Sequence, residues 1–366
     1  MSLSVGIVGL PNVGKSTLFN ALTKNSVPME NYPFCTIDPS VGVVAVPDSR
    51  LATLSEISGS EEILPAIIEF VDIAGLVKGA SAGEGLGNKF LANIRETDMI
   101  AEVVRIFEDS DIHHVSGSVD PMGDIETINL ELIMADAETV SKRLSNLERD
   151  VKRGDKAAVA EKALLEKMAS HLQAGHLANS LGITDEEKKI LKGLHLLTMK
   201  QFLYVCNKKQ DAFNLDEHND DRWQELLAFF EKTDSEYVIV DAGMEHELRD
   251  LGDEEKTEFR REYGAQDSGV ETLIRACYHR LGLMSYFTTG EKETRAWTVP
   301  IGSTGPEAGA AIHSDFQTKY IRAQVVAFED LVKAGSKAKA RDEGKLRTEG
   351  KEYIVKDGDV IEFMHS

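Results

Sequence analysis

The most constraining feature of the sequence is a glycine-rich segment at residues 9–17, which read GLPNVGKST. An apolar run at residues 5–8 precedes it, and a helical pattern follows from Leu18 to Leu22. In a loop between a strand and a helix, backbone N–H groups and the positive helix end point at a phosphate, while a lysine reaches the β- and γ-phosphates. The segment therefore predicts a nucleoside triphosphate site, with Lys15 as the phosphate cation and Ser16 as a Mg²⁺ ligand. The alternative is a simple glycine turn between a strand and a helix.

Two further segments favour the nucleotide interpretation. An apolar run at residues 67–71 leads into DIAG at residues 72–75, where we expect Asp72 to hold a Mg²⁺-bound water and the Gly75 amide to touch the γ-phosphate. Between these segments lies NYPFCT at residues 31–36, and Thr36 is the candidate hydroxyl that completes the Mg²⁺ shell. The three segments occur in the order that a switch nucleotide hydrolase requires, so Lys15, Asp72 and Gly75 are the expected catalytic residues.

The base-recognition segment is expected at residues 207–211, which read NKKQD. GTP-binding proteins read guanine with NKxD, because one carboxylate accepts from both N1–H and the exocyclic amine. Gln210 stands in that position here, and a neutral amide cannot accept both protons but can pair with an adenine edge. Asp211, one residue later, could reach the base after a small change of the loop. The expected nucleotide contacts are Asn12, Val13, Gly14, Lys15, Ser16, Thr17, Asn207, Lys208 and Gln210.

Length and charge limit the other possibilities. The chain has 366 residues, 42% of them apolar, which allows two or three domains with a large core. No apolar run approaches a membrane span and the start lacks a basic signal region, so we expect a cytoplasmic protein without a membrane partner. The net charge of −21 argues against non-specific binding of nucleic acid, because most of the protein surface would repel a phosphate backbone. We expect no DNA partner.

The spacing of the motifs indicates an insertion. Asp72 and Asn207 are 135 residues apart, whereas a minimal P-loop domain needs about 60 residues there. A heptad-like apolar seam runs from Ile133 to Val151, a turn follows at residues 153–155, and a second apolar face contains Leu165, Met168 and Leu172. We expect an antiparallel helical hairpin inserted at about residues 128–200; the alternative is a pair of ordinary amphipathic helices on the domain.

The rest of the chain completes an α/β fold. The sequence predicts strands at residues 201–206 and 237–240, which end at the carboxyl edge of a doubly wound sheet. It predicts a helix at residues 270–281. Short runs at 295–299, 316–328 and 353–355 indicate a small α+β module. From residue 285 onward there are 12 Lys and Arg against 13 Asp and Glu, so nearly all of the net negative charge lies before this residue. We expect a nucleotide-binding domain over 1–284 and a separate unit over 285–366.

Five segments together resemble the YchF, or Obg-like, ATPase family: residues 9–23, 31–39, 72–81, 83–98 and 295–299. The resemblance covers essentially the whole chain. It implies a P-loop domain with a coiled-coil insertion, a C-terminal TGS domain of ubiquitin-like β-grasp fold, and a cytosolic ATPase associated with ribosomes and stress responses. The family usually carries NxxE in the base motif, so Gln210 departs from both the GTPase and the family pattern.

The resemblance leaves the hydrolysis mechanism and the partner surface open. Leu76 follows DxxG where switch GTPases carry a glutamine that orients water, so hydrolysis uses another element or is slow. Related P-loop proteins hold K⁺ from the position of Asn12, which makes K⁺ a further candidate ion. The basic run from Lys333 to Arg347 is either a solvated face or a contact for rRNA in the 70S ribosome or its large subunit. The alternatives to an ATPase are a GTPase translation factor and an ATP-gated binding protein with incidental hydrolysis.

Overall fold

The computed structural model describes residues 3–23, 38, 40–73, 85–109, 118–248, 251–262 and 268–365. It divides into two compact units. Unit 1 comprises Met1–Gly42 and Glu69–Leu273, and unit 2 comprises Val43–Ile68 and Ile274–Ser366. No helix in the described ranges combines the length and the apolarity that a membrane crossing needs.

Unit 1 is built on a six-stranded sheet in the order β2-β4-β1-β5-β7-β9. The strands are β2 (Val41–Ala45), β4 (Ile67–Asp72), β1 (Ser4–Val8), β5 (Met99–Arg105), β7 (Gln201–Asn207) and β9 (Tyr237–Val240). All neighbouring pairs from β4 to β9 are parallel, so these strands end at one edge of the sheet. This is the doubly wound α/β arrangement that the sequence predicts.

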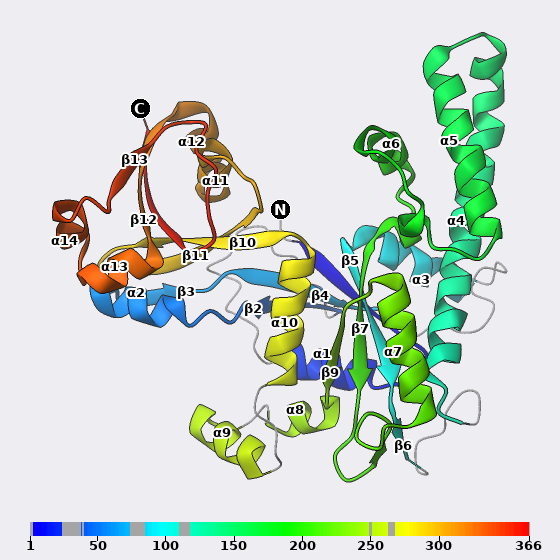
Figure 1. The fold of residues 1–366 in the computed structure, drawn as a ribbon, viewed down its shortest axis with the longest axis horizontal. Helices are drawn as coiled ribbons and strands as arrows, with labels where there is room; N and C mark the ends of the chain where they lie inside the picture. Colours follow the sequence, from blue (N-terminus) through cyan, green and yellow to red (C-terminus); the bar gives the residue numbers. More distant parts are fainter. Residues whose placement is uncertain are drawn as a thin grey trace. The chain divides into compact units, whose positions relative to one another are not determined.

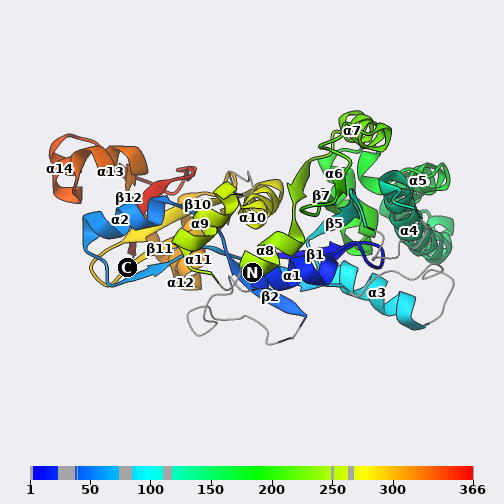
Figure 2. The same cartoon turned by 90° about the horizontal axis from the view of Figure 1, so that it is seen from below.

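Helices cover both faces of this sheet, as Figure 2 shows. One face carries α1 (Lys15–Thr23) and α8 (Ala242–Leu248), and the other carries α3 (Gly85–Glu96), α4 (Pro121–Lys152) and α7 (Asp221–Thr233). Unit 1 also contains β6 (Phe107–Glu108), β8 (Phe213–Asn214) and α9 (Asp253–Glu262), and α10 (Gly269–Arg280) begins in unit 1 and continues into unit 2. Because both faces are covered, the central strand β5 is buried at every residue.

The predicted helical hairpin is confirmed. Helix α4 runs for 32 residues and α5 (Lys156–Gln173) lies antiparallel beside it (Figure 1). Asp155 caps α5 by accepting hydrogen bonds from the N–H groups of Ala157 and Ala158, and Gly154 has the positive φ that the tight turn requires. The shared core contains the expected seam and also residues from the segment that follows, including Leu191 and Leu196.

That following segment returns the chain to the sheet through short helices. They are η3 (Ala178–Ser180), α6 (Asp185–Leu191), η4 (Lys192–Leu194) and η5 (Leu197–Met199). Thr184 and Glu187 form a capping box at the start of α6. Asp136 of α4 accepts hydrogen bonds from the backbone N–H groups of Leu197 and Thr198 and from the Thr198 hydroxyl, which fixes η5 against the long helix.

Unit 2 has its own six-stranded sheet, in the order β13-β12-β14-β10-β11-β3. Its C-terminal strands are β10 (Leu283–Thr289), β11 (Glu293–Pro300), β12 (Tyr320–Ala327), β13 (Arg347–Glu349) and β14 (Asp359–His365). The last strand, β14, lies parallel to the first, β10, and antiparallel to β12. With α11 (Gly305–Ile312) crossing between the β10–β11 hairpin and β12, this is the strand order of a β-grasp fold.

The sixth strand of this sheet comes from the first quarter of the chain. Strand β3 (Glu62–Leu64) pairs in parallel with β11, and the Ser60 hydroxyl donates to the carbonyl oxygen of Gly290. The division of the structure therefore differs from the expected boundary between residues 284 and 285. Residues 43–68 group with the C-terminal residues, because β3 and Ser60 have hydrogen-bond partners more than 200 positions later in the sequence.

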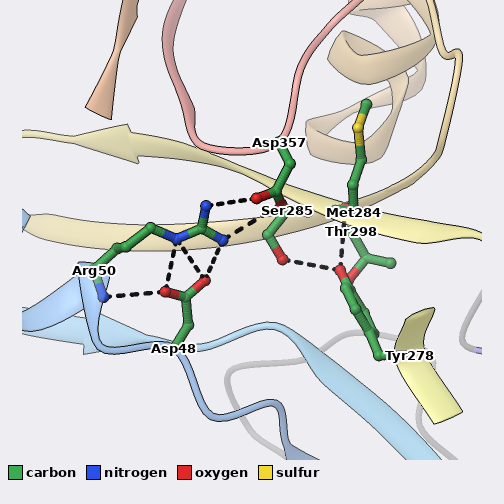
Figure 3. A network of polar contacts seen from close by, with 7 residues as sticks. All are labelled: Asp48, Arg50, Tyr278, Met284, Ser285, Thr298 and Asp357. Carbon is green, nitrogen blue, oxygen red and sulfur yellow. Dashed lines mark hydrogen bonds and ion pairs between the residues drawn. The ribbon is translucent and has the colours of Figure 1, made fainter. Parts of the chain in front are cut away.

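Side-chain contacts also join α2 (Arg50–Ser58) to this sheet (Figure 3). The Arg50 guanidinium lies between two carboxylates, with Nη1 2.6 Å from Asp357 and Nη2 2.7 Å from Asp48. Asp357 also accepts a hydrogen bond from the Ser285 N–H, and the Tyr278 hydroxyl lies 3.0 Å from the Ser285 hydroxyl. The other helices of this unit are α12 (Ser314–Lys319), α13 (Phe328–Ala334) and α14 (Lys337–Asp342).

The run at 316–328 was expected as one short alternating segment. In the structure it begins in α12, and β12 starts only at Tyr320. Residues 353–355 contribute a single bridge at Ile354 rather than a strand. Strands β10 and β14, which form the centre of this sheet, were not predicted.

Candidate nucleotide site

The glycine-rich loop leaves β1 at the carboxyl edge of the unit 1 sheet and enters α1 at Lys15. Its shape depends on two residues with positive φ, Asn12 at 65° and Gly14 at 102°. A Cβ atom on Gly14 would lie 2.3 Å from Nδ2 of Asn207, and one on Gly9 would lie 2.7 Å from the Val103 carbonyl oxygen. Glycine is therefore required at both positions, because the loop fits closely over β5 and β7.

Lys15 is almost fully buried at the start of α1. Its Nζ donates a hydrogen bond of 2.6 Å to the carbonyl oxygen of Leu10, so the ammonium lies inside the curve of the loop. Burial lowers the pKa of Lys15 to about 8, and the Asp72 carboxylate acts in the opposite direction. A partly desolvated cation in a ring of backbone groups suits an anionic ligand such as a phosphate.

Asp72 and Ser16 form the second part of the site. Asp72 is the last residue of β4 and lies in register with Ile7 of β1, which brings it beside the start of the loop. The Ser16 hydroxyl is hydrogen-bonded to its carboxylate, and Lys15 lies close enough to lower its pKa, although burial has the larger effect and raises it. A hydroxyl and a carboxylate are hard oxygen ligands, so this pair fits Mg²⁺.

The base motif is tied directly to the loop by Asn207, at the end of β7. Its Nδ2 donates to the Val13 carbonyl oxygen at 2.8 Å, and its Oδ1 accepts from the Ala242 N–H at 3.0 Å. Asn207 is nearly fully buried, so neither bond competes with water. The asparagine thus joins the P-loop, the base motif and the start of α8.

The residues after Asn207 form a turn that two ion pairs and a backbone hydrogen bond stabilise. Lys208 pairs with Glu217 at 2.9 Å, and Lys209 pairs with Asp109. The Gln210 N–H donates to Asp241 Oδ2 at 2.7 Å, and Gln210 is half-buried. Asp211 follows with a positive φ of 58° and is exposed.

Asp241 is a site residue whose role the sequence analysis did not identify. It is buried just after β9 and also accepts hydrogen bonds from the backbone N–H groups of Met244 and Gly243. Burial raises the pKa of Asp241, and these hydrogen bonds oppose the rise. The available signal was its place at the end of a predicted strand, beside Asn207 in the sheet.

The structure therefore brings Asn12, Val13, Gly14, Lys15, Ser16, Thr17, Asp72, Asn207, Lys208 and Gln210 to the carboxyl edge of one sheet. Their assignment as nucleotide ligands stays a prediction. Thr36, Gly75 and Leu76 lie outside the described residues.

Comparison with known proteins gives a consistent family assignment. A family model described as a 50S ribosome-binding GTPase matches residues 4–134, and the model YchF-GTPase_C, described as a protein of unknown function, matches residues 283–366. The chain is 51% identical to the ribosome-binding ATPase YchF of Bacillus subtilis and 50% identical to that of Haemophilus influenzae, over 99% of each chain. The solved structure of the Schizosaccharomyces pombe YchF GTPase is similar with a TM-score of 0.88 at 36% identity, covering 99% of this chain and 98% of that one.

Proposed function

The chain belongs to the YchF family, and from this premise we propose that it is a Mg²⁺-dependent ATPase that binds the ribosome and hydrolyses ATP to ADP and phosphate. The observation that carries the proposal is the single polar unit formed by the P-loop, Asn207 and the Gln210 turn. Lys15 neutralises the β- and γ-phosphates, and backbone N–H groups of residues 12–17 surround them. Ser16 would ligate Mg²⁺ and Asp72 would hold a Mg²⁺-bound water, and the ion would supply positive charge to the transferring phosphate.

The preference for ATP rests on Gln210. The hydrogen bond from its backbone N–H to Asp241 opposes the shift of the loop that would bring Asp211 to the base. Guanine would then leave N1–H or the exocyclic amine without an acceptor, whereas adenine can pair with the neutral amide. Gln210 itself does not provide the carboxylate that GTP-binding proteins place at this position.

GTP remains the competing substrate because an aspartate follows directly at position 211. The related S. pombe protein is described as a GTPase, while the related bacterial proteins are described as ATPases. Dissociation constants for ATP and GTP, measured side by side by calorimetry with Mg²⁺ present, decide between the two. Equal affinities, or tighter binding of GTP, would overturn the adenine assignment.

We assign unit 2 to the TGS class on its β-grasp strand order, and we propose that it contributes to ribosome binding. The basic run expected to meet rRNA is largely compensated by neighbours: Lys337 lies 3.8 Å from Glu362, Lys345 lies 3.4 Å from Asp330, and Arg347 lies 3.6 Å from Asp359. Among the described residues, Lys333, Lys339 and Arg341 are the members of the run that are exposed and without an ion pair. An rRNA contact through this surface therefore depends mainly on these three side chains.

A cytoplasmic location follows from the proposed ribosome partner. Co-sedimentation of the full chain with purified 70S ribosomes and with isolated large subunits, with ADP or a non-hydrolysable ATP analogue, tests the partner. Binding that depends on the nucleotide supports a switch; absence of binding in every nucleotide state would remove the ribosome from the proposal.

A further inference from the structure

Unit 1 contains a second concave site, formed by residues other than those of the nucleotide site. It is a pocket of about 430 Å³ between the segment from α6 to η5 and Asp98, which joins α3 to β5. A volume of this size is within the range of ligand sites in proteins. The nucleotide proposal gives this pocket no role.

The inner part of the pocket is apolar. It is formed by Leu191, Leu196 and Met199. Leu191 and Leu196 are 2% and 3% exposed and belong to the hydrophobic core that α4 and α5 share, and Met199 packs against the same core. The apolar floor is thus continuous with a rigid core, so an apolar group bound there would replace water without a large rearrangement.

Cations surround this floor. The other lining residues include Lys188, Lys189, Lys192, Lys200 and His195. Lys189 and Lys192 are exposed and make no ion pair or hydrogen bond with another described side chain, whereas Lys188 is paired with Asp185 and Lys200 donates to backbone carbonyls of Arg95 and Thr97. The single acidic lining residue, Asp98, already accepts hydrogen bonds from the N–H and hydroxyl of Ser4.

The concentration of positive charge is unusual for this chain, whose net charge is −21. An anionic partner would be repelled by most of the surface and attracted at this pocket, which favours one orientation of approach. The apolar lining adds a second requirement, because a purely ionic ligand would leave the partly exposed Met199 in contact with water. The ligand should therefore carry carboxylates or phosphates on both sides of an apolar group.

We propose that this pocket docks an acidic peptide segment of a partner protein, with one or two large aliphatic side chains on the floor and flanking carboxylates at Lys189 and Lys192. Single-stranded RNA fits less well, because recognition of its bases uses stacking on several aromatic rings, and the imidazole of His195 is the one ring among the described residues that line the pocket. A bare phosphate backbone would also make no use of Leu191, Leu196 and Met199. The proposal is independent of the nucleotide preference, since none of these residues lies in the P-loop or the base motif.

The test measures fluorescence anisotropy of a labelled peptide, in which two leucines stand among aspartates and glutamates, with the full chain. The double variant Lys189→Glu/Lys192→Glu should weaken binding about tenfold or more, because both substitutions place carboxylates against the peptide. The matched control is Lys142→Glu/Lys156→Glu, which makes the same change of charge at exposed lysines of α4 and α5 outside the pocket. The control should change affinity by less than about twofold at physiological ionic strength.

Two further arms separate the contributions. Replacing the leucines of the peptide by serine should weaken binding to the unaltered protein if the apolar floor is used, and an oligouridylate of equal charge should bind more weakly than the leucine peptide. Unchanged ATP affinity of the double variant verifies that it is folded. The proposal is overturned if the leucine peptide does not bind, if oligouridylate binds as well or better, if serine replacement has no effect, or if both double variants weaken binding equally.

Discussion

The side-chain amide of Asn207 donates a 2.8 Å hydrogen bond to the carbonyl oxygen of Val13, a residue 194 positions earlier in the chain. Through this bond, the base motif and the phosphate loop share one buried polar group. The same amide accepts from the Ala242 N–H, so three segments meet at a single side chain. Changes at this position should therefore affect phosphate binding as well as base recognition.

Asn207→Ala should weaken ATP and GTP by similar factors. The substitution leaves the Val13 carbonyl and the Ala242 N–H without partners, at a cost of about 1–3 kcal/mol for each buried group. Urea unfolding should show this loss of stability, and calorimetry should show the parallel loss of both affinities. Asn20→Ala, at an exposed position of α1, is the control and should be near neutral. A selective loss of one nucleotide would contradict the structural role of Asn207.

The affinity for ATP should fall as the pH rises through about 8, the pKa to which burial lowers that of Lys15. Below this pH the ammonium is charged and attracts the phosphates; above it the free protein loses that charge, and binding must take up a proton. Calorimetry in buffers of different ionisation enthalpy measures the uptake directly. Lys15→Arg keeps its charge over the whole range, so its residual ATP affinity should be nearly independent of pH. An equally steep fall in that variant would assign the titration to another group.

Gln210→Asp should shift the preference toward GTP. The new carboxylate can accept from both guanine protons, which removes a loss of about 1–3 kcal/mol for each unpaired group. The Gln210 N–H bond to Asp241 uses the backbone and survives the substitution. The ratio of the ATP and GTP dissociation constants is the measurement, and Asp211→Asn is the matched control. If the control lowers GTP affinity while Gln210→Asp does not raise it, Asp211 is the residue that reads the base.

Hydrolysis should be slow and should depend on K⁺. Leu76 cannot orient a water molecule, so turnover in Na⁺ should lie well below the usual 1–10³ s⁻¹ range of enzymes. A K⁺ ion held at Asn12 would supply positive charge at the transferring phosphate. Single-turnover rates in the two salts should therefore differ, and Asn12→Ala should abolish the difference. Identical rates in K⁺ and Na⁺ would exclude this role of Asn12.

Ribosome co-sedimentation should fall steeply with salt, by about 0.7–0.9 in log affinity per log salt for each neutralised phosphate. Lys333→Glu/Lys339→Glu should weaken it, because these lysines, like Arg341, are exposed cations of the basic run that form no ion pair with a described residue. ATP affinity should remain unchanged. Lys292→Glu/Lys351→Glu has the same charge change in unit 2 and serves as the control. An equal effect of both variants would reveal a general charge effect rather than a site.

The parts of the fold with a strong local signal were predicted from the sequence. The apolar runs that became β1, β4, β7 and β9, and the heptad seam from Ile133 to Val151, follow directly from side-chain periodicity. The YchF family assignment and the α/β fold class are confirmed. The sequence does not predict the structural role of Asp241, because that role depends on a hydrogen bond from Gln210, 31 residues away, and no local pattern encodes this pairing.

The position of β3 also depends on residues that are distant in the sequence, and no local pattern predicts it. Its three residues carry no strand pattern of their own, and Ile63 is 44% exposed. Strand β3 pairs with β11, which is the edge strand of the β10–β11 hairpin, and this hairpin is formed by residues more than 200 positions later in the sequence. Short edge strands of this kind are determined by tertiary context, which sequence periodicity does not contain.

The route of the chain between β2 and β4 determines where the protein can be truncated. The polypeptide leaves unit 1 after residue 42 and contributes helix α2 and strand β3 to unit 2, where β3 joins the C-terminal sheet. It returns to unit 1 at residue 69, three residues before Asp72. Ending the gene after residue 284 would thus remove β11 from β3 and Asp357 from Arg50, leaving a guanidinium and a strand edge without partners in the remaining half. The C-terminal unit cannot be removed alone: an excision that keeps the sheet of unit 1 intact has to remove the segment between β2 and β4, with α2 and β3, together with the C-terminus.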